Sequence, residues 1–277
     1  MPEPNRYHLN PIRLFWLTII GRAYPRVVAG MRMKSWILMD IAFPLVGAVA
    51  MVYVYQGLHA PRQYLGFVVM GGAMLAFWQN VLWMMAAQFS WDRDNGTLEL
   101  YAISPTTFEA VLLGMALGGM LATLLRAAVI LVLCSWLFHV EYVWAGVPAA
   151  AGVFVLTLAA LYCLGMMLAS LFLFYSREAW HLADALQEPV NFLSGLYFPV
   201  RALGAYVAGG ASLVPLTLGL DAMRQFLLPG TPRFLAPGVE TLIVALQLPL
   251  FAFLAYMSLR FMEARARREG RLISKWA

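Results

Sequence analysis

Six long apolar runs constrain the fold more than any other feature of the sequence; five of them hold at most one charged side chain, and the sixth, 179–198, holds His181, Asp184 and Glu188. About 20 apolar residues cross the hydrocarbon core of a bilayer as a helix, and within that core only helices and closed barrels satisfy their own backbone. Hydrophobic residues make up 62% of the chain and charged residues 12%, against about 45–50% and about 25% in soluble domains. The sequence therefore predicts an all-α integral membrane protein.

We predict one transmembrane helix in each run. The six runs cover residues 37–55, 64–87, 110–138, 142–176, 179–198 and 241–259. A further apolar run, 204–220, is short, rich in glycine and broken by Pro215. Irregular backbone is tolerated at membrane depth where protein surrounds it, so we predict a re-entrant hairpin within an external region, residues 199–240. An ordinary seventh span is the alternative.

Basic residues are concentrated in parts of the chain that six spans would place on one side of the membrane. Most lie in residues 1–35 and in the tail, 260–277. The other side would hold only Arg62, Arg201, Arg224 and Arg233. Because cytoplasmic segments carry an excess of Lys and Arg, we expect both termini and the 88–109 loop to be cytoplasmic. The abundant Ala and Arg and the few Lys suggest a GC-rich bacterial genome, and hence the bacterial inner membrane.

Within residues 1–35, apolar side chains alternate with Arg13, Thr18 and Arg22. This pattern is typical of an amphipathic helix that lies in the headgroup plane and turns its arginines towards anionic lipid. We therefore predict an interfacial helix ahead of the first span, with an unstructured basic tail as the alternative.

The sequence lacks the motifs of the common catalytic sites. Cys134 and Cys163 fall inside predicted spans, and the four histidines are scattered without metal-ligand spacing. A phosphate-binding loop needs a lysine directly after a glycine-rich turn, but Lys34 and Lys275 follow Met33 and Ser274. We therefore predict a protein that is not an enzyme and that itself binds no metal or cofactor. If the protein is driven by ATP, the ATPase must be another subunit.

A short polar segment, residues 92–105, interrupts the apolar sequence between the second and third spans. Gly96 allows a sharp turn, Thr97 can cap a helix, and Glu99 in its first turn suits the helix dipole. The helix would present Leu98, Leu100, Tyr101 and Ile103 on its surface. Apolar side chains beside charges favour a surface that a partner covers, although a solvated connector is the alternative.

Three stretches resemble motifs of one transporter family. They are Asn95-Gly96-Thr97-Leu98-Glu99-Leu100 with Ser104-Pro105, Leu193-Ser194-Gly195-Leu196-Tyr197-Phe198-Pro199, and Pro215-Leu216-Thr217 with Asp221-Ala222-Met223-Arg224. In this order they are similar to the cytoplasmic loop, the fifth helix and the region before the last span of ATP-binding-cassette (ABC) type-2 exporter permeases. The resemblance covers nearly the whole chain. It departs from the family pattern where Asn95 separates Asp94 from the glycine.

The resemblance implies that the 88–109 loop holds a coupling helix, which docks into a groove on a separate ATPase subunit. The residues that match this role are Asp94, Gly96, Thr97, Leu98, Glu99, Leu100 and Tyr101, and those that match the re-entrant region are Pro199, Pro215, Asp221 and Arg224. It also implies that two copies of the chain work with two ATPase subunits, which bind ATP and Mg²⁺. The implied activity is export of an amphipathic substrate such as a drug, a lipid or a lipid-linked glycan.

The fifth predicted span carries polar residues at spacings of three and four, which place them on one helix face. They are Arg177, His181, Asp184, Glu188 and Asn191. Arg126 in the third span is the natural countercharge for one of the carboxylates, and we expect it to pair with Glu188. The stripe could line the translocation path, or it could hold helices together. The sequence leaves both interpretations open.

Two other functions also remain open at this stage. A channel or secondary transporter would work without an ATPase and would make the 88–109 loop incidental. A polytopic enzyme acting on lipid would need clustered catalytic groups at one depth, and the sequence offers only Asp184, Glu188 and Arg126. No feature indicates a nucleic-acid partner.

Overall fold

The computed structural model describes residues 10–32, 34–61, 63–88, 91–92, 95–97, 100–101, 104–175 and 179–268, and all regular structure within these ranges is helical. The helices are α1 (Pro11–Arg32), α2 (Lys34–Gly57), α3 (Gln63–Gln79), η1 (Asn80–Ala86), α6 (Phe108–Phe138), η2 (Trp144–Gly146), α7 (Val147–Tyr175), α8 (Ala179–Leu193), η4 (Val200–Leu203), α9 (Ala205–Ala211), α10 (Pro215–Leu227) and α11 (Pro237–Arg268). The element η1 is a π-helix that continues α3, whereas η2 and η4 are short 3₁₀ turns.

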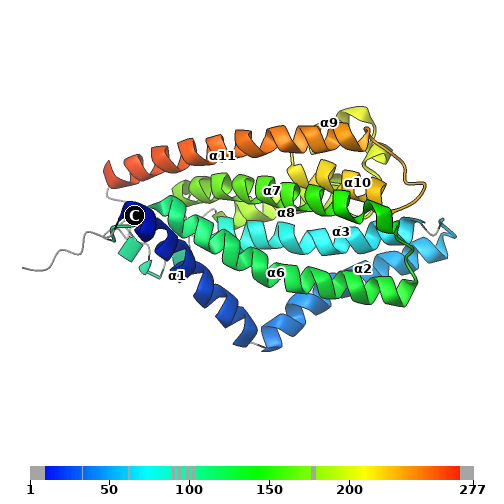
Figure 1. Ribbon diagram of the computed structural model, residues 1–277, viewed down its shortest axis with the longest axis horizontal. Helices are drawn as coiled ribbons and strands as arrows, with labels where there is room; N and C mark the ends of the chain where they lie inside the picture. Colours follow the sequence, from blue (N-terminus) through cyan, green and yellow to red (C-terminus); the bar gives the residue numbers. More distant parts are fainter. Residues whose placement is uncertain are drawn as a thin grey trace, which may run out of the picture.

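The long helices α3, α6, α7 and α11 run roughly along the long axis of an elongated bundle (Figure 1). Helix α3 with η1 is the central element of the bundle. In its most apolar stretch of 18 residues 94% of the residues are buried, compared with 22% in the corresponding stretch of α11. Its large side chains Phe67, Phe77 and Trp78 belong to the main core. Surface helices such as α11 therefore present apolar side chains outwards, as expected of helices surrounded by lipid.

The two ends of the bundle collect different segments. The start of α1, the connection between η1 and α6, and the end of α11 lie at one end (Figure 1). Arg260 near the end of α11 accordingly lies 3.9 Å from Glu109 at the start of α6. The α9–α10 hairpin lies at the other end, where the Val143 amide donates to the Leu227 carbonyl at 2.8 Å. We call these the loop end and the hairpin end.

Within the residues that the structure describes, four helices are long and apolar enough to cross a membrane, and the count rises to five if the bent pair α9 and α10 is one broken span. The all-α membrane fold is therefore confirmed. In the described part of α2, Ile41–Gly57 forms a shorter apolar helix, and α8 has 15 residues. For that reason the predicted number of six spans stays a prediction. Helices α9 and α10 meet at a bend of 108°, which is the geometry of a broken span or a re-entrant loop.

Helix α1 packs across the first half of α6, where two glycines allow a close approach. A Cβ atom on Gly114 would lie 2.7 Å from the Ile19 carbonyl oxygen, and one on Gly118 would lie 2.9 Å from the Ala23 carbonyl oxygen. Residues 11–32 therefore form a packed helix rather than an unstructured tail. Its outer face is apolar, with exposed side chains at Ile12, Trp16, Leu17, Ile20 and Tyr24. Such a face suits a helix that lies against lipid.

Candidate functional site

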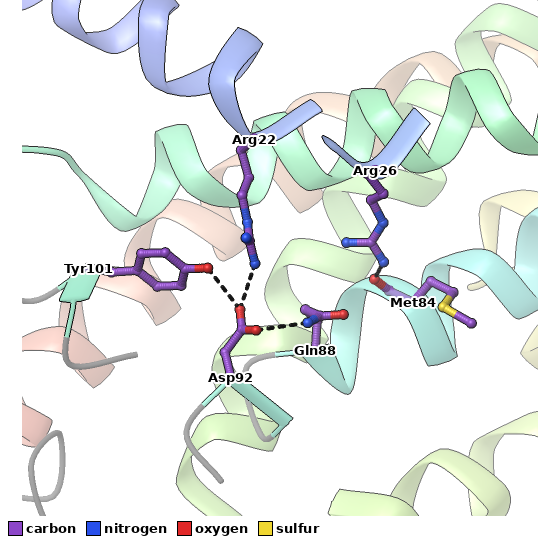
Figure 2. Close-up of polar contacts among 6 residues, drawn as sticks. All are labelled: Arg22, Arg26, Met84, Gln88, Asp92 and Tyr101. Carbon is purple, nitrogen blue, oxygen red and sulfur yellow. Dashed lines mark hydrogen bonds and ion pairs between the residues drawn. The ribbon is translucent and has the colours of Figure 1, made fainter. Parts of the chain in front are cut away.

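The buried carboxylate of Asp92 joins three segments at the loop end of the bundle (Figure 2). Its Oδ2 lies 2.9 Å from Nη2 of Arg22 on α1, and its Oδ1 accepts a hydrogen bond from Gln88 Nε2 at 2.8 Å. The Tyr101 hydroxyl donates to Oδ2 at 3.3 Å. We call this group of four residues the Asp92 junction. It fastens both α1 and residue 101 to the chain just beyond η1.

Both oxygens of the buried Asp92 carboxylate have hydrogen-bond partners. A buried carboxylate is costly unless hydrogen-bonded and paired, and here two neutral donors and one guanidinium meet it. The guanidinium carbon of Arg22 also lies 5.0 Å from the centre of the Tyr101 ring, within cation–π range. Burial and the neighbouring carboxylate raise the pKa of Tyr101, so the phenol stays protonated and keeps its hydrogen bond.

Arg26 lies one helical turn beyond Arg22 on α1 and reaches η1. Its guanidinium donates to the backbone carbonyl of Met84 (Figure 2). Burial, reinforced by repulsion from Arg22, lowers the pKa of Arg26 to about 10. The side chain therefore remains charged at neutral pH. Helix α1 thus holds the chain at two successive points, Met84 and Asp92.

The predicted coupling residues surround the Asp92 junction where the structure describes them. Gly96 has a φ of 74°, in the left-handed region that glycine enters readily. Thr97 is half-buried, Tyr101 is part of the junction, and Leu100 is 60% exposed. Asp94, Leu98 and Glu99 lie outside the described residues. The described part of the segment therefore has one side bonded to the bundle and an apolar side chain turned outwards.

The polar stripe of α8 turns away from the bundle. His181, Asp184 and Glu188 are exposed, and Asn191 is half-buried. Helix α8 is attached to η1 by a hydrogen bond from Trp83 Nε1 to Gln187 Oε1. Arg177 lies outside the described residues. The stripe is thus a surface feature of the single chain.

Arg126 and Glu188 form no ion pair, although both belong to the part of the chain that the structure describes. The Arg126 Nε donates to the Ala122 carbonyl at 3.4 Å, and its charge acts on Arg26 and Tyr162. Arg126 is half-buried on α6, near enough to Arg26 on α1 and Tyr162 on α7 to act on them, whereas Glu188 is exposed on α8. The expected pairing of these two residues is wrong, because helical spacing gives no information on which way α6 faces.

Two of the three family-like stretches bond to each other through Arg224. This fully buried side chain donates to the carbonyl oxygens of Gly195, Leu196 and Phe67, at 2.7 Å for the last two. Its guanidinium carbon also lies 4.3 Å from the centre of the Phe67 ring. Arg224, expected among the external basic residues, is therefore an internal tie between α10, the turn after α8 and α3. Gly71 makes room for this turn, since a Cβ there would overlap the Leu196 carbonyl.

Asp221, one turn before Arg224, fixes the other side of α10. Its Oδ2 accepts hydrogen bonds from the Phe234 amide at 3.3 Å and from Gln225 Nε2 at 3.1 Å. The same Gln225 nitrogen donates to Glu240 Oε2 on α11 at 2.9 Å. Pro215 occupies the first turn of α10, where no amide hydrogen is needed, and Pro199 is the residue before η4. These residues therefore hold the hairpin in place.

Sequence reasoning missed Arg22, Arg26, Gln88 and Asp92 as members of the site. A signal was available, because Arg22 and Arg26 are four residues apart in an apolar stretch, as are Gln88 and Asp92. That spacing puts each pair on one helix face. The contact between the two faces joins residues 70 positions apart and needed the tertiary structure. No group of three or more His, Cys, Asp or Glu in the described ranges could hold a metal ion.

The part of the chain that holds the Asp92 junction and the Arg224 tie matches a known protein family. The family model described as "ABC-2 type transporter" matches residues 27–228, which include α2 to α10 and the Asp92 segment. A comparison with curated proteins found no match. The matched region covers most of the chain and contains all three family-like stretches. The chain therefore belongs to the ABC-2 type transporter family and is the membrane-spanning permease part of an ABC transporter.

Proposed function

We propose that the chain is the membrane subunit of an ATP-driven exporter, and that a separate ATPase subunit docks on residues 91–101. The observation that carries this proposal is the Asp92 junction. It bonds a short surface segment to α1 and to the end of η1 while leaving Leu100 outside. A partner that moved Leu100 would move buried elements of the bundle with it.

The proposed activity is export of an amphipathic substrate by two copies of the chain with two ATPase subunits, which supply ATP and Mg²⁺. The polar stripe of α8 supports a second copy or a water-filled path, because His181, Asp184 and Glu188 are exposed in the single chain. A carboxylate facing lipid costs about 2.5–3.5 kcal/mol on insertion scales. In the assembled transporter this face would therefore line the path or meet the partner copy.

Replacing Leu100 by aspartate is expected to reduce the stimulation of the ATPase by the permease at least tenfold. The substitution puts a charge on the apolar surface that the ATPase would cover, and an unpaired charge in an interface is costly. The measurement is ATP hydrolysis by the co-expressed ATPase, in lipid vesicles, with and without the permease variant. Because Leu100 is exposed, the variant should fold and insert normally.

Leu58→Asp is the matched control, since Leu58 is 71% exposed and lies in the α2–α3 turn at the hairpin end. It should stimulate the ATPase as the wild type does. Full stimulation by Leu100→Asp would exclude docking on this segment. A chain that purifies without any ATPase and still transports without ATP would instead be a channel or a secondary transporter.

The proposed orientation puts the loop end in the cytoplasm and the hairpin end outside. A cysteine at Tyr206, which is 97% exposed on α9, should react with a membrane-impermeant maleimide in intact cells. A cysteine at Leu100 should react only after the membrane is permeabilised. The background is a chain with Cys134→Ala and Cys163→Ala, which lacks the two native thiols. Labelling of Leu100→Cys, but not Tyr206→Cys, in intact cells would reverse the orientation.

A further inference from the structure

The π-helix η1 is an unusual element, and it lies directly between the central helix α3 and the Asp92 junction. Its wider turn is marked by the hydrogen bond from the Ala87 amide to the Leu82 carbonyl, five residues back, at 3.2 Å. A π-helical segment inside an α-helix is rare and frequently accompanies a functional site. Here it is part of the buried core and leads directly to the segment that carries Leu100.

The first residue of η1 is anchored within the bundle. The Tyr162 hydroxyl on α7 donates to Asn80 Oδ1 at 2.9 Å. Helix α6 approaches the same amide so closely that a Cβ on Gly119 would lie 2.6 Å from Asn80 Oδ1. Two helices therefore fix where the π-helix begins, and any change of pitch must appear at its other end.

Helix α1 holds that other end at two points. Arg26 donates to the Met84 carbonyl inside η1, and Arg22, one turn earlier, pairs with Asp92 beyond it. Figure 2 shows both arginines extending from α1 towards this stretch of chain. Helix α1 is itself pressed against α6 at Gly114 and Gly118. Helix α1 is therefore held by α6 in a position from which Arg26 reaches η1 and Arg22 reaches Asp92.

We propose that Arg26 is a positioning residue, which keeps η1 in its π-helical pitch and thereby sets the orientation of the 91–101 segment. The guanidinium binds the Met84 carbonyl in the geometry that the wide turn gives it. Changing one turn from a five-residue to a four-residue hydrogen bond shifts the following residues by one helical position. In an α-helix that shift corresponds to a rotation of about 100° and a rise of about 1.5 Å.

This change of pitch would convert a rotation of the 91–101 segment into a displacement at the end of the central helix, without unfolding either element. Shifts of helix register occur on the microsecond-to-millisecond timescale, which suits a transport cycle. The significance for coupling rests on the proposed docking of an ATPase. The support that Arg26 gives to η1 does not depend on that docking, and it can be measured on the chain alone.

The test is amide hydrogen exchange of the full chain in lipid nanodiscs. Arg26→Gln is expected to speed exchange in peptides covering residues 80–88 at least tenfold, while peptides from the core of α7 stay at the wild-type rate. Arg26→Lys keeps the charge and a donor and should stay within about threefold of wild type. Arg22→Gln should affect mainly residues 91–101. The matched control is Arg13→Gln, an exposed arginine of the same helix, which should change nothing.

A second measurement follows the position of the segment. Spin labels at Leu100→Cys and Leu117→Cys, in a background of Cys134→Ala and Cys163→Ala, report the distance from the segment to α6. Arg26→Gln should add a displaced population that is absent from the wild type and from Arg13→Gln.

Unchanged exchange and an unchanged distance in Arg26→Gln would overturn the proposal. So would exchange that rises equally in η1 and α7 in Arg26→Gln, since this would show general loosening. Failure of ATPase stimulation in the wild type would overturn the docking proposal alone.

Discussion

Replacing Arg224 by alanine is expected to lower the melting temperature of the detergent-solubilised protein by at least about 6 °C and to reduce the yield of folded chain. The substitution leaves the carbonyls of Gly195, Leu196 and Phe67 without this donor in a fully buried site. Each unsatisfied buried group costs about 1–3 kcal/mol, and 1 kcal/mol corresponds to about 2–4 °C in a chain of this size class. Thermal unfolding followed by thiol reactivity of the buried Cys134 would measure the loss.

Arg201 provides the matched control, because it is an exposed arginine in η4 of the same region. Arg201→Ala should melt within about 2 °C of wild type, since surface substitutions away from special features have small effects. Arg224→Lys should be intermediate, because an ammonium cannot reach three acceptors in the fork geometry of a guanidinium. A melting temperature of Arg224→Ala equal to that of wild type would contradict the tie between α10, the turn after α8 and α3.

Replacing Asp92 by asparagine is expected to reduce stimulation of the partner ATPase about tenfold. The change removes the charge that holds Arg22, and it leaves Arg22 and Arg26 repelling each other on α1. The segment that carries Leu100 should then move independently of α1. The assay is the ATP hydrolysis measurement used for the Leu100 variant, with the permease content of the vesicles matched by quantitative immunoblotting.

A double-mutant cycle separates the pair from its surroundings. The thermal stability of the chain alone is compared for Arg22→Gln, Asp92→Asn and the double variant. The stability losses of the two single variants, added together, should exceed the loss in the double variant by about 1 kcal/mol or more. The reversed pair, Arg22→Asp with Asp92→Arg, should recover part of the stimulation. Strictly additive losses would show that Arg22 and Asp92 act independently. Arg13→Gln controls for the removal of one positive charge from α1.

Prediction from the sequence succeeded for the long apolar helices, which depend on the hydrophobicity of consecutive residues. Hydrophobicity alone identified the long apolar runs, and the structure has helices α3, α6, α7 and α11 at four of them. The ends of the helices differ from the ends of the runs because a helix continues into polar surroundings. Both Glu240 and Arg260 lie within α11, for example. Helix α8 ends at Leu193, and Gly195 follows with a φ of 68°, well before the end of the 179–198 run.

The candidate site could be predicted only in part. The family-like stretches pointed to the 91–101 segment and to Arg224, since such motifs consist of residues close together in the sequence and can be recognised without a structure. The π-helix could not be predicted, because Asn80–Ala86 reads as an ordinary apolar segment and its pitch depends on contacts with Arg26, Tyr162 and Gly119. Nor could the side of the bundle that Arg126 faces, since spacing along one helix does not define the face that packs inwards.

The sequence by itself determined that the protein is helical, that it belongs in a membrane, and which transporter family it joins. These properties depend on average apolarity and on motifs, both of which are written along the chain. Only the tertiary structure decided that Arg22 meets Asp92, that Arg224 is an internal tie, and that Arg126 donates to the Ala122 carbonyl while Glu188 is exposed on α8. Such pairings depend on the rotation and crossing of whole helices. Those are set by close packing, as at Gly114, Gly118 and Gly71, where the fit of many side chains and backbones decides which polar groups can reach each other.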